Sequence, residues 1–246
     1  MPGSLPAVSL GDIGTAEEQR VLAASASGAW VALCSASAKT PTLVLGSGTG
    51  EPIDDVLARD ASGRYLVVTQ DGAALLVDAS SGARVSLSER GADVRRVRAD
   101  YAEHRSLSFD AAGRSLAYLR QQGSSRLLVV RELESGAERT FAAGAGDVYR
   151  LALSADGRQL LFDAVREDSN KNGKLDWPAP EDTARSNSCD RALPKFRSFG
   201  YQGRGDQLTR AVVSLADGNV RDLPELVTPL GASLLVREPD GSLKLD

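Results

Sequence analysis

"LALSADGRQLLFD", residues 151–163, contains two short apolar runs separated by a tight turn at Gly157. Related phrases begin at Leu22, Leu57 and Leu107, and each has a glycine at the same place in its turn. Glycine supplies the positive φ that such turns require, and the apolar runs suit strands that are buried on both faces. Each phrase therefore predicts two antiparallel strands joined by a tight turn.

A second phrase follows three of these hairpins. It reads "LLVDASSGARVSL" at 75–87, "LLVVRELESGAERTF" at 127–141 and "RAVVSLADGNVRDL" at 210–223. Each predicts a third strand, a glycine turn and a more polar fourth strand. Four strands that repeat at about 35 to 50 residues are typical of a β-propeller blade. An up-and-down sandwich is the alternative, but it would not repeat the same two turn phrases in order.

The number of repeats predicts five blades. Four begin near Leu22, Leu57, Leu107 and Leu151, and residues 227–246 supply three strands of a fifth. The N-terminal stretch 3–14 resembles the fourth-strand phrase at 82–93, so we expect it to add the missing strand of the last blade. The sequence thus predicts an all-β, single-domain, five-bladed β-propeller of four-stranded blades over 1–246, closed by an N-terminal strand. A fragment of a longer propeller is the alternative.

The turn phrase S-x-D-G-R-x-L followed by L-x-V-x-x-L-x-S-G resembles the repeats of TolB-like β-propellers over most of the chain. The first blade departs from this pattern, because "SASGAW" at 25–30 lacks the acidic turn residue. The resemblance implies a bacterial periplasmic or secreted protein. It leaves the function open, because such propellers serve as binding platforms, enzyme lids and sensor domains.

Composition excludes several classes of partner. The 246 residues have a net charge of -4, and the isoelectric point near 5.2 gives no basic footprint for nucleic acid. No apolar stretch approaches the roughly 18 residues of a membrane span, so we expect no membrane insertion. The first residues have neither region of a signal peptide, so we expect the native leader to be absent from this sequence.

One segment breaks the repeat. Residues 167–207 interrupt the fourth blade between its second and third strands, and loops of this length in a compact domain are usually functional or disordered. The segment begins with "EDSNKNGKLDWP", in which side-chain oxygens alternate around a glycine, Gly173. The predicted ligands are Asp168, Asn170, Asn172, the carbonyl group of Lys174, and Asp176.

This spacing predicts a structural Ca²⁺ site, because Ca²⁺ takes six or more oxygen ligands, whereas Mg²⁺ needs a tighter octahedron and Zn²⁺ prefers His or Cys. Ala179 stands where an EF-hand has glutamate. The pattern instead resembles the D-x-D-x-D-G-x-x-D loops between propeller strands, as in integrin α subunits. A polar Asn-Gly turn without metal is the alternative.

The insertion and a second long loop contain candidate binding residues. Aromatic and basic side chains are enriched where proteins meet, but such rings also pack loops down, and charged runs are often only solvated surface. The candidates are Trp177, Phe196, Arg197 and Tyr201 in the insertion, and Arg95, Arg96 and His104 between the second and third blades.

Two cysteines, Cys34 and Cys189, leave the redox state open. Both are expected where second strands lead to third strands, which emerge on one face of a propeller. A disulfide would tether the insertion across that face. Two free thiols, with Cys34 as a small buried apolar residue, are the alternative.

Catalytic motifs are lacking. His104 is the only histidine, and no G-x-S-x-G elbow, phosphate-binding loop or zinc motif occurs. We therefore predict a monomeric, non-catalytic module that binds a protein or peptide on the face carrying the insertion. The first alternative is the propeller of a larger enzyme or receptor, such as a prolyl-oligopeptidase-like peptidase. The second is a hydrolase site that gathers Asp60, Asp110 and His104.

Overall fold

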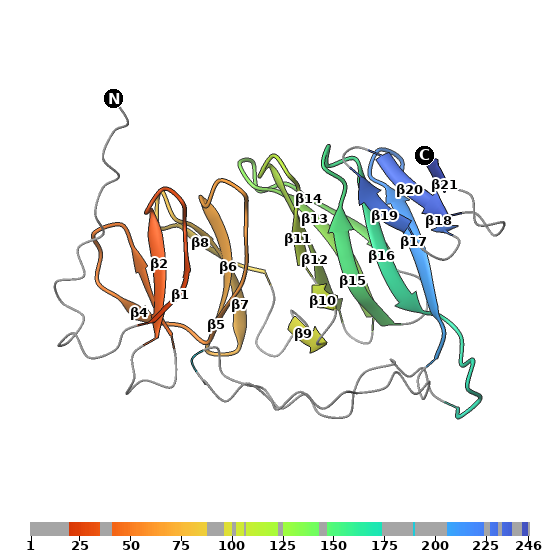
Figure 1. Cartoon of the computed structure of the whole chain (residues 1–246), viewed down its shortest axis with the longest axis horizontal. Helices are drawn as coiled ribbons and strands as arrows, with labels where there is room; N and C mark the ends of the chain where they lie inside the picture. Colours follow the sequence, from red (N-terminus) through yellow and green to blue (C-terminus); the bar gives the residue numbers. More distant parts are fainter. Residues whose placement is uncertain are drawn as a thin grey trace. The chain divides into compact units, whose positions relative to one another are not determined.

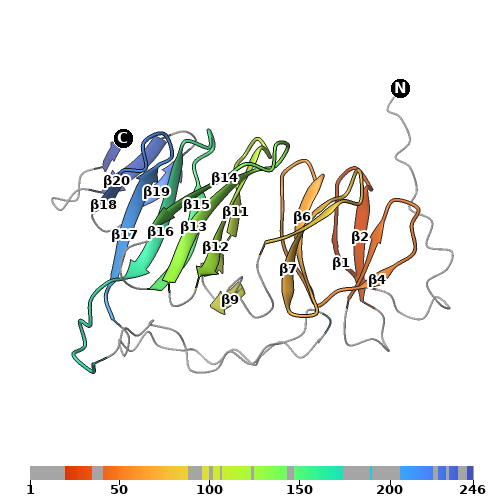
Figure 2. The ribbon, with the colours of Figure 1, turned by 180° about the vertical axis from the view of Figure 1, so that it is seen from behind.

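The computed structural model describes residues 20–34, 41–87, 96–99, 102–105, 107–122, 125–142, 147–173, 189, 206–223, 227–230, 233–237 and 243–245. Two compact units comprise 1–92 with 184–198, and 93–183 with 199–246. Every element in the described residues is a β-strand (Figures 1 and 2).

The first unit contains two four-stranded antiparallel sheets, each with its strands in sequence order. The first sheet has strands β1 (Arg20–Ala24), β2 (Trp30–Cys34), β3 (Thr42–Leu45) and β4 (Glu51–Pro52). The second has strands β5 (Asp55–Arg59), β6 (Tyr65–Gln70), β7 (Ala73–Asp78) and β8 (Arg84–Ser86).

The second unit contains two more four-stranded meanders, a three-stranded sheet and a hairpin. The meanders are β11 (Leu107–Phe109), β12 (Ser115–Gln122), β13 (Ser125–Glu132) and β14 (Glu138–Ala142), and then β15 (Asp147–Leu153), β16 (Gln159–Val165), β17 (Leu208–Ser214) and β18 (Val220–Leu223). The three-stranded sheet is β19 (Val227–Leu230), β20 (Ser233–Arg237) and β21 (Leu243–Leu245), and the hairpin is β9 (Arg96–Ala99) with β10 (Ala102–Arg105).

This topology confirms an all-β chain of four-stranded antiparallel sheets, each with the strand order of one propeller blade. The residues at 227–245 form the predicted three strands. Residues 3–14, which are expected to close the last sheet, lie outside the described residues, so the five-blade ring remains a prediction. The β9–β10 hairpin was not predicted, because its polar, Arg-rich sequence lacks the alternation of a half-buried strand.

Neighbouring sheets pack face to face within each unit. In the first unit, Trp30 and Leu43 of the first sheet share a buried core with Leu66 and Val68 of the second. In the second unit, the two meanders share a larger core around Phe162. Strand β2 is buried on both faces, since every one of its residues is buried. This burial explains its continuous apolar sequence.

The β1–β2, β5–β6, β11–β12 and β15–β16 turns share one pattern of hydrogen bonds. The first turn residue is buried and accepts hydrogen bonds from the backbone of its own turn. It is Ser25, Asp60, Asp110 or Ser154. Asp60, for example, accepts from the N–H of Tyr65 at 2.8 Å. Asp60 and Asp110 therefore have structural roles in their turns.

The turn glycine of the next sheet approaches this buried residue closely. Gly63 has φ +74°, and a Cβ added there would lie 2.7 Å from Cβ of Ser25 in the first sheet. In the second unit, a Cβ on Gly157 would lie 3.1 Å from Oδ2 of Asp110. Trp30 also donates a hydrogen bond from its indole nitrogen to the carbonyl oxygen of Gly63 at 2.8 Å. Only glycine fits both the backbone angle and the gap between the sheets.

A charged cluster joins three strands of the β11–β14 sheet. Glu138 of β14 accepts hydrogen bonds from Tyr118 at 2.7 Å, from Arg120 at 2.8 Å and from Arg131 at 2.8 Å. Burial opposes ionisation of Glu138, but these donors outweigh it and hold the pKa of its carboxyl below the ordinary value. Burial and the bond to Glu138 raise the pKa of Tyr118.

Replacing Gly63 tests the sheet contact. We expect Gly63→Ala to lower the free energy of unfolding by about 1 kcal/mol for the positive φ and by a further 1–3 kcal/mol for the clash with Ser25. Gly82→Ala is the matched control, because Gly82 has φ +72° and nothing within 4 Å of an added Cβ. Urea unfolding of both variants measures the difference, and equal losses would refute the contact.

Glu138 gives a pH prediction. Because its folded pKa is depressed, its stabilising effect is complete above the ordinary value of 4.5 and is lost as the pH falls through the folded pKa. Glu138→Gln is therefore expected to flatten the decline in the free energy of unfolding from pH 5 to about pH 3. Urea titrations across this range measure the slope, and identical slopes in variant and wild type would contradict the assignment.

Candidate functional site

The insertion begins after β16 and ends before β17, and these two strands are paired with each other. β16 and β17 stay in register up to the pair Val165 and Leu208. Arg210 binds the buried carboxylate of Asp163 through Nε at 2.6 Å and Nη2 at 2.9 Å. This bond to Asp163 also raises the pKa of Arg210. The described strands on either side of the insertion therefore form a fixed base.

The start of the insertion is a curved loop with oxygen atoms directed inward. The Oδ1 atoms of Asp168 and Asn170 both accept a hydrogen bond from the N–H of Asn172, each at 3.0 Å. The other carboxylate oxygen of Asp168 accepts from the N–H of Gly173 at 2.7 Å. Positive φ values of +58° at Lys171 and +84° at Gly173 produce the sharp bend. Two of the predicted ligand oxygens thus converge on one nitrogen atom.

The far end of the insertion holds this loop in place. Asp206, which is 2% exposed, accepts hydrogen bonds at Oδ1 from the hydroxyl of Ser169 at 3.2 Å and from the N–H of Asn170 at 3.0 Å. The N–H of Gln207 donates to the Ser169 hydroxyl at 2.7 Å. We call Ser169, Asn170, Asp206 and Gln207 the base clamp. Sequence reasoning missed it, because no spacing pattern links residues so far apart.

These residues fit a hard cation. Oxygen donors at the first, third and fifth positions of the loop, with glycine at the sixth, are the ligand set that Ca²⁺ prefers. Among the described residues, no group of three or more His, Cys, Asp or Glu side chains is placed to hold a metal. The predicted site depends on amide and backbone oxygens as well as on carboxylates. Lys174 and Asp176 lie outside the described residues.

The described part of the insertion also includes a disulfide. Cys189 is bonded to Cys34, the last residue of β2, with the two Cα atoms 5.4 Å apart. Of the two alternatives from the sequence, the structure has the bonded one. Cys34 is buried, and residues 184–198 belong to the first unit, whereas both ends of the insertion belong to the second. The insertion is therefore covalently attached to the first unit.

The predicted binding residues are only partly described. Trp177, Phe196, Arg197, Tyr201 and Arg95 lie outside the described residues. Arg96 and His104 belong to the β9–β10 hairpin, where Arg96 is paired with Arg105 and His104 with Val97. The structure thus places two of the seven candidates on one hairpin and leaves the proposed surface a prediction.

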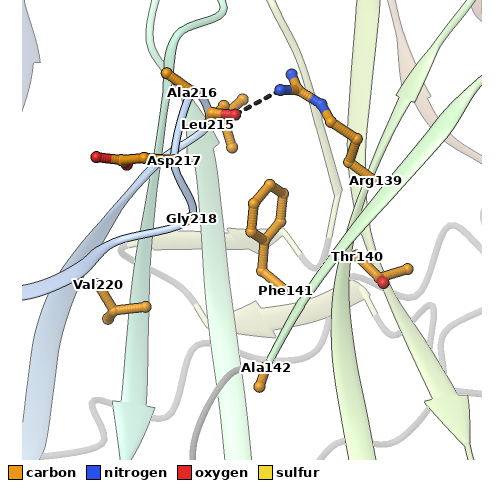
Figure 3. Close-up of a pocket in the computed structure, with 9 residues that line it drawn as sticks. All are labelled: Arg139, Thr140, Phe141, Ala142, Leu215, Ala216, Asp217, Gly218 and Val220. Carbon is orange, nitrogen blue, oxygen red and sulfur yellow. Dashed lines mark hydrogen bonds between the residues drawn. The ribbon is translucent and has the colours of Figure 1, made fainter.

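A shallow groove lies between β14 and the β17–β18 turn (Figure 3). Its lining residues are Arg139, Thr140, Phe141, Ala142, Leu215, Ala216, Asp217, Gly218 and Val220. Arg139 crosses the groove and donates a hydrogen bond to the carbonyl oxygen of Leu215, while the ring of Phe141 lies beside Gly218. The sequence does not predict this groove, because its lining residues come from two different repeats.

Comparison with known proteins gives structural similarities only. No protein-family model and no curated protein sequence matches the chain. Hydrazine synthase from Kuenenia stuttgartiensis is 14% identical with a TM-score of 0.42, over 87% of this chain and 60% of that one. A protein described as TolB from Agrobacterium tumefaciens is 13% identical with a TM-score of 0.44, over 93% and 80% of the two chains.

The β-propeller domain of the Trilobed protease from Pyrococcus furiosus is 12% identical with a TM-score of 0.40, over 75% of this chain and 47% of that one. The chain spans only part of the length of each of these three structures. At these identities and TM-scores, the similarities do not assign a function. No helix long and apolar enough to cross a bilayer occurs in the described part of the chain.

Proposed function

We propose that the chain is a non-catalytic β-propeller that binds or scaffolds another protein or a peptide and is stabilised by Ca²⁺. The observation that carries the proposal is the set of four-stranded meanders that pack face to face through buried cores. Repeated four-stranded sheets are how propellers avoid exposed strand edges. The three-stranded sheet β19–β21 supports a ring in which residues 3–14 add the last strand.

Calcium has a structural role in this proposal. A long segment without its own core loses conformational entropy when it is ordered. A cation at Asp168, Asn170, Asn172 and Asp176 would offset this cost at the start of the insertion. The convergent oxygens of Asp168 and Asn170 support the site. The two expected carboxylates, Asp168 and Asp176, favour a modest affinity, which suits the free Ca²⁺ found outside the cytoplasm.

The disulfide supports an extracytoplasmic location, periplasmic or secreted, because such bonds persist in oxidising compartments. The insertion is the part of the chain that departs most from the repeat, so we place the binding face there, with Trp177, Phe196, Arg197 and Tyr201 as contacts. The proposed protein is monomeric, with no nucleic acid partner and no membrane insertion.

The alternative is the propeller part of a larger enzyme or receptor, such as a prolyl-oligopeptidase-like peptidase. The gene sequence distinguishes the two proposals. A downstream region with a G-x-S-x-G elbow would favour the peptidase, whereas its absence would favour the binding module.

Calcium removal tests the metal site. At a Ca²⁺ concentration 100 times the Kd, binding adds about 2.7 kcal/mol, which for a chain of this size raises the unfolding temperature by roughly 5 to 10 °C relative to EGTA. Asp168→Ala is expected to abolish this rise. Thermal unfolding followed by circular dichroism measures both.

Asp217→Ala is the matched control, because Asp217 accepts a hydrogen bond from the N–H of Asn219 in an exposed turn of the same sheet. This variant is expected to keep the calcium-dependent rise. If wild-type protein unfolds at the same temperature in Ca²⁺ and EGTA, the metal site is refuted.

A triple alanine variant tests the binding face. We expect Phe196→Ala with Arg197→Ala and Tyr201→Ala to reduce recovery of a bound protein at least tenfold in cross-linked pulldowns, because a few aromatic and arginine side chains dominate most interfaces. Val85→Ala, at an exposed position of β8, is the control. Equal recovery by the triple variant and the wild type would exclude this face.

A further inference from the structure

Asn172 and Gly173 form the only Asn-Gly pair in the chain, since none of the other three asparagines precedes a glycine. Such a pair is chemically reactive, because glycine has no side chain to shield its backbone nitrogen. That nitrogen can attack the side-chain amide carbon of the asparagine before it. Residues 171–173 are exposed, so water and dissolved base have access to the pair.

The reaction is an intramolecular displacement between adjacent residues. The Gly173 nitrogen bonds to Cγ of Asn172 and loses its proton to solvent. The bond from Cγ to Nδ2 breaks, and Nδ2 takes up a proton and leaves as ammonia. Water then opens the resulting five-membered succinimide at either carbonyl group, which leaves aspartate or isoaspartate at position 172. In total, a water molecule enters and an ammonia molecule leaves, so no oxidant or reductant is needed.

The structure holds the reacting nitrogen in a hydrogen bond. The N–H of Gly173 donates to a carboxylate oxygen of Asp168 at 2.7 Å, the distance of a charge-assisted bond. The N–H of Asn172 donates to Oδ1 of Asp168 and to Oδ1 of Asn170, each at 3.0 Å. The peptide groups on both sides of the Asn172 side chain are therefore held within the same loop.

Attack on Asn172 requires the bond between Gly173 and Asp168 to break, because the nitrogen must give up the same proton that it donates. Negative charge then develops on this nitrogen beside the Asp168 carboxylate, and like charges in close contact repel each other. A hydrogen bond to a charged group corresponds to roughly a tenfold to hundredfold change in an equilibrium. The carboxylate is therefore expected to slow the reaction by about the same factor.

We propose that Asn172 is a modification site whose conversion to aspartate or isoaspartate is controlled by Asp168. The side chain stays an amide while Asp168 holds the Gly173 N–H, and it converts when that bond is released. Aspartate adds a negative charge at the fifth position of the loop, and isoaspartate also lengthens the backbone by a methylene group. This inference goes beyond the proposed function and does not depend on bound Ca²⁺.

The test compares the rate of conversion in the full chain and in a synthetic peptide of residues 168–181, both incubated in EGTA at neutral pH. Digestion of the protein with Glu-C in mildly acidic buffer releases the same peptide, which begins after Glu167 and ends at Glu181. Liquid chromatography with mass spectrometry separates its asparagine, aspartate and isoaspartate forms. We expect wild-type protein to convert at least about tenfold more slowly than the peptide. Asn170 precedes Lys171 and is the internal control within the same peptide.

Two variants separate the hydrogen bond from a general loosening of the loop. Asp168→Ala is expected to raise the rate of conversion to nearly that of the peptide. Ser169→Ala is the matched control, because it removes a hydroxyl of the base clamp but keeps the acceptor of the Gly173 N–H. We expect this control to convert at the wild-type rate. Far-UV circular dichroism checks that both variants are folded, and if Asp168→Ala is unfolded, the comparison of wild-type protein with the peptide decides.

Several results would overturn the proposal. A peptide that stays unmodified would remove the site, and wild-type protein that converts as fast as the peptide would exclude protection by the fold. A folded Asp168→Ala variant with the wild-type rate would exclude control by Asp168. Equal acceleration in Ser169→Ala and Asp168→Ala would exclude it too, because any loosening of the loop would then suffice. None of these results bears on the proposed calcium site, which thermal unfolding in Ca²⁺ and EGTA tests separately.

Discussion

The close approach of a turn glycine to a buried polar residue is the contact on which the packing of the sheets depends. Gly63 meets Ser25 in the first unit, and Gly157 meets Asp110 in the second. A Cβ at Gly63 would clash with Ser25 beside the core that contains Trp30, whereas a Cβ at Gly157 would lie in tight contact with the Asp110 carboxylate beside the core that contains Phe162. The hydroxyl of Ser25 and Oδ1 of Asp110 are satisfied in the buried turns because each accepts hydrogen bonds from backbone N–H groups of its own turn. One short turn therefore closes the hairpin, donates hydrogen bonds to a buried polar group and allows two sheets to pack closely.

The sequence predicted the repeated parts of the fold well, and for a physical reason. Each turn is local, so its glycine and the apolar runs beside it can be identified without knowing the rest of the structure. The first strand of the third blade was expected at Leu107 and the third strand of the fourth blade at Leu208, and both strands begin there. Interactions between distant residues were not predictable in this way. The charged cluster around Glu138 joins three strands. The base clamp joins residues from the two ends of the insertion, and no sequence motif connects them.

The insertion shows how much of a structure a local sequence pattern can predict. The spacing of Asp168, Asn170 and Gly173 predicted a curved loop with inward oxygens, and the hydrogen bonds to Asn172 and Gly173 have that form. Spacing did not reveal that the loop is held from the other end of the insertion. It also left open whether Cys34 and Cys189 are joined, because a pairing across so much sequence depends on the tertiary fold. We propose the functional site at this insertion because it interrupts the regular repeats. It is held by the base clamp and by the disulfide.

The proposal that the sheets form one closed ring makes a definite statement about size. A compact domain of 246 residues has a radius of gyration of roughly 18 Å. Small-angle X-ray scattering of the monomer, with a mass of 25.9 kDa confirmed from the forward scattering, measures this radius directly. A value near 18 Å with a single-peaked distance distribution is predicted for a closed propeller. A clearly larger radius with a two-peaked distribution, as for two separate bodies, would contradict it.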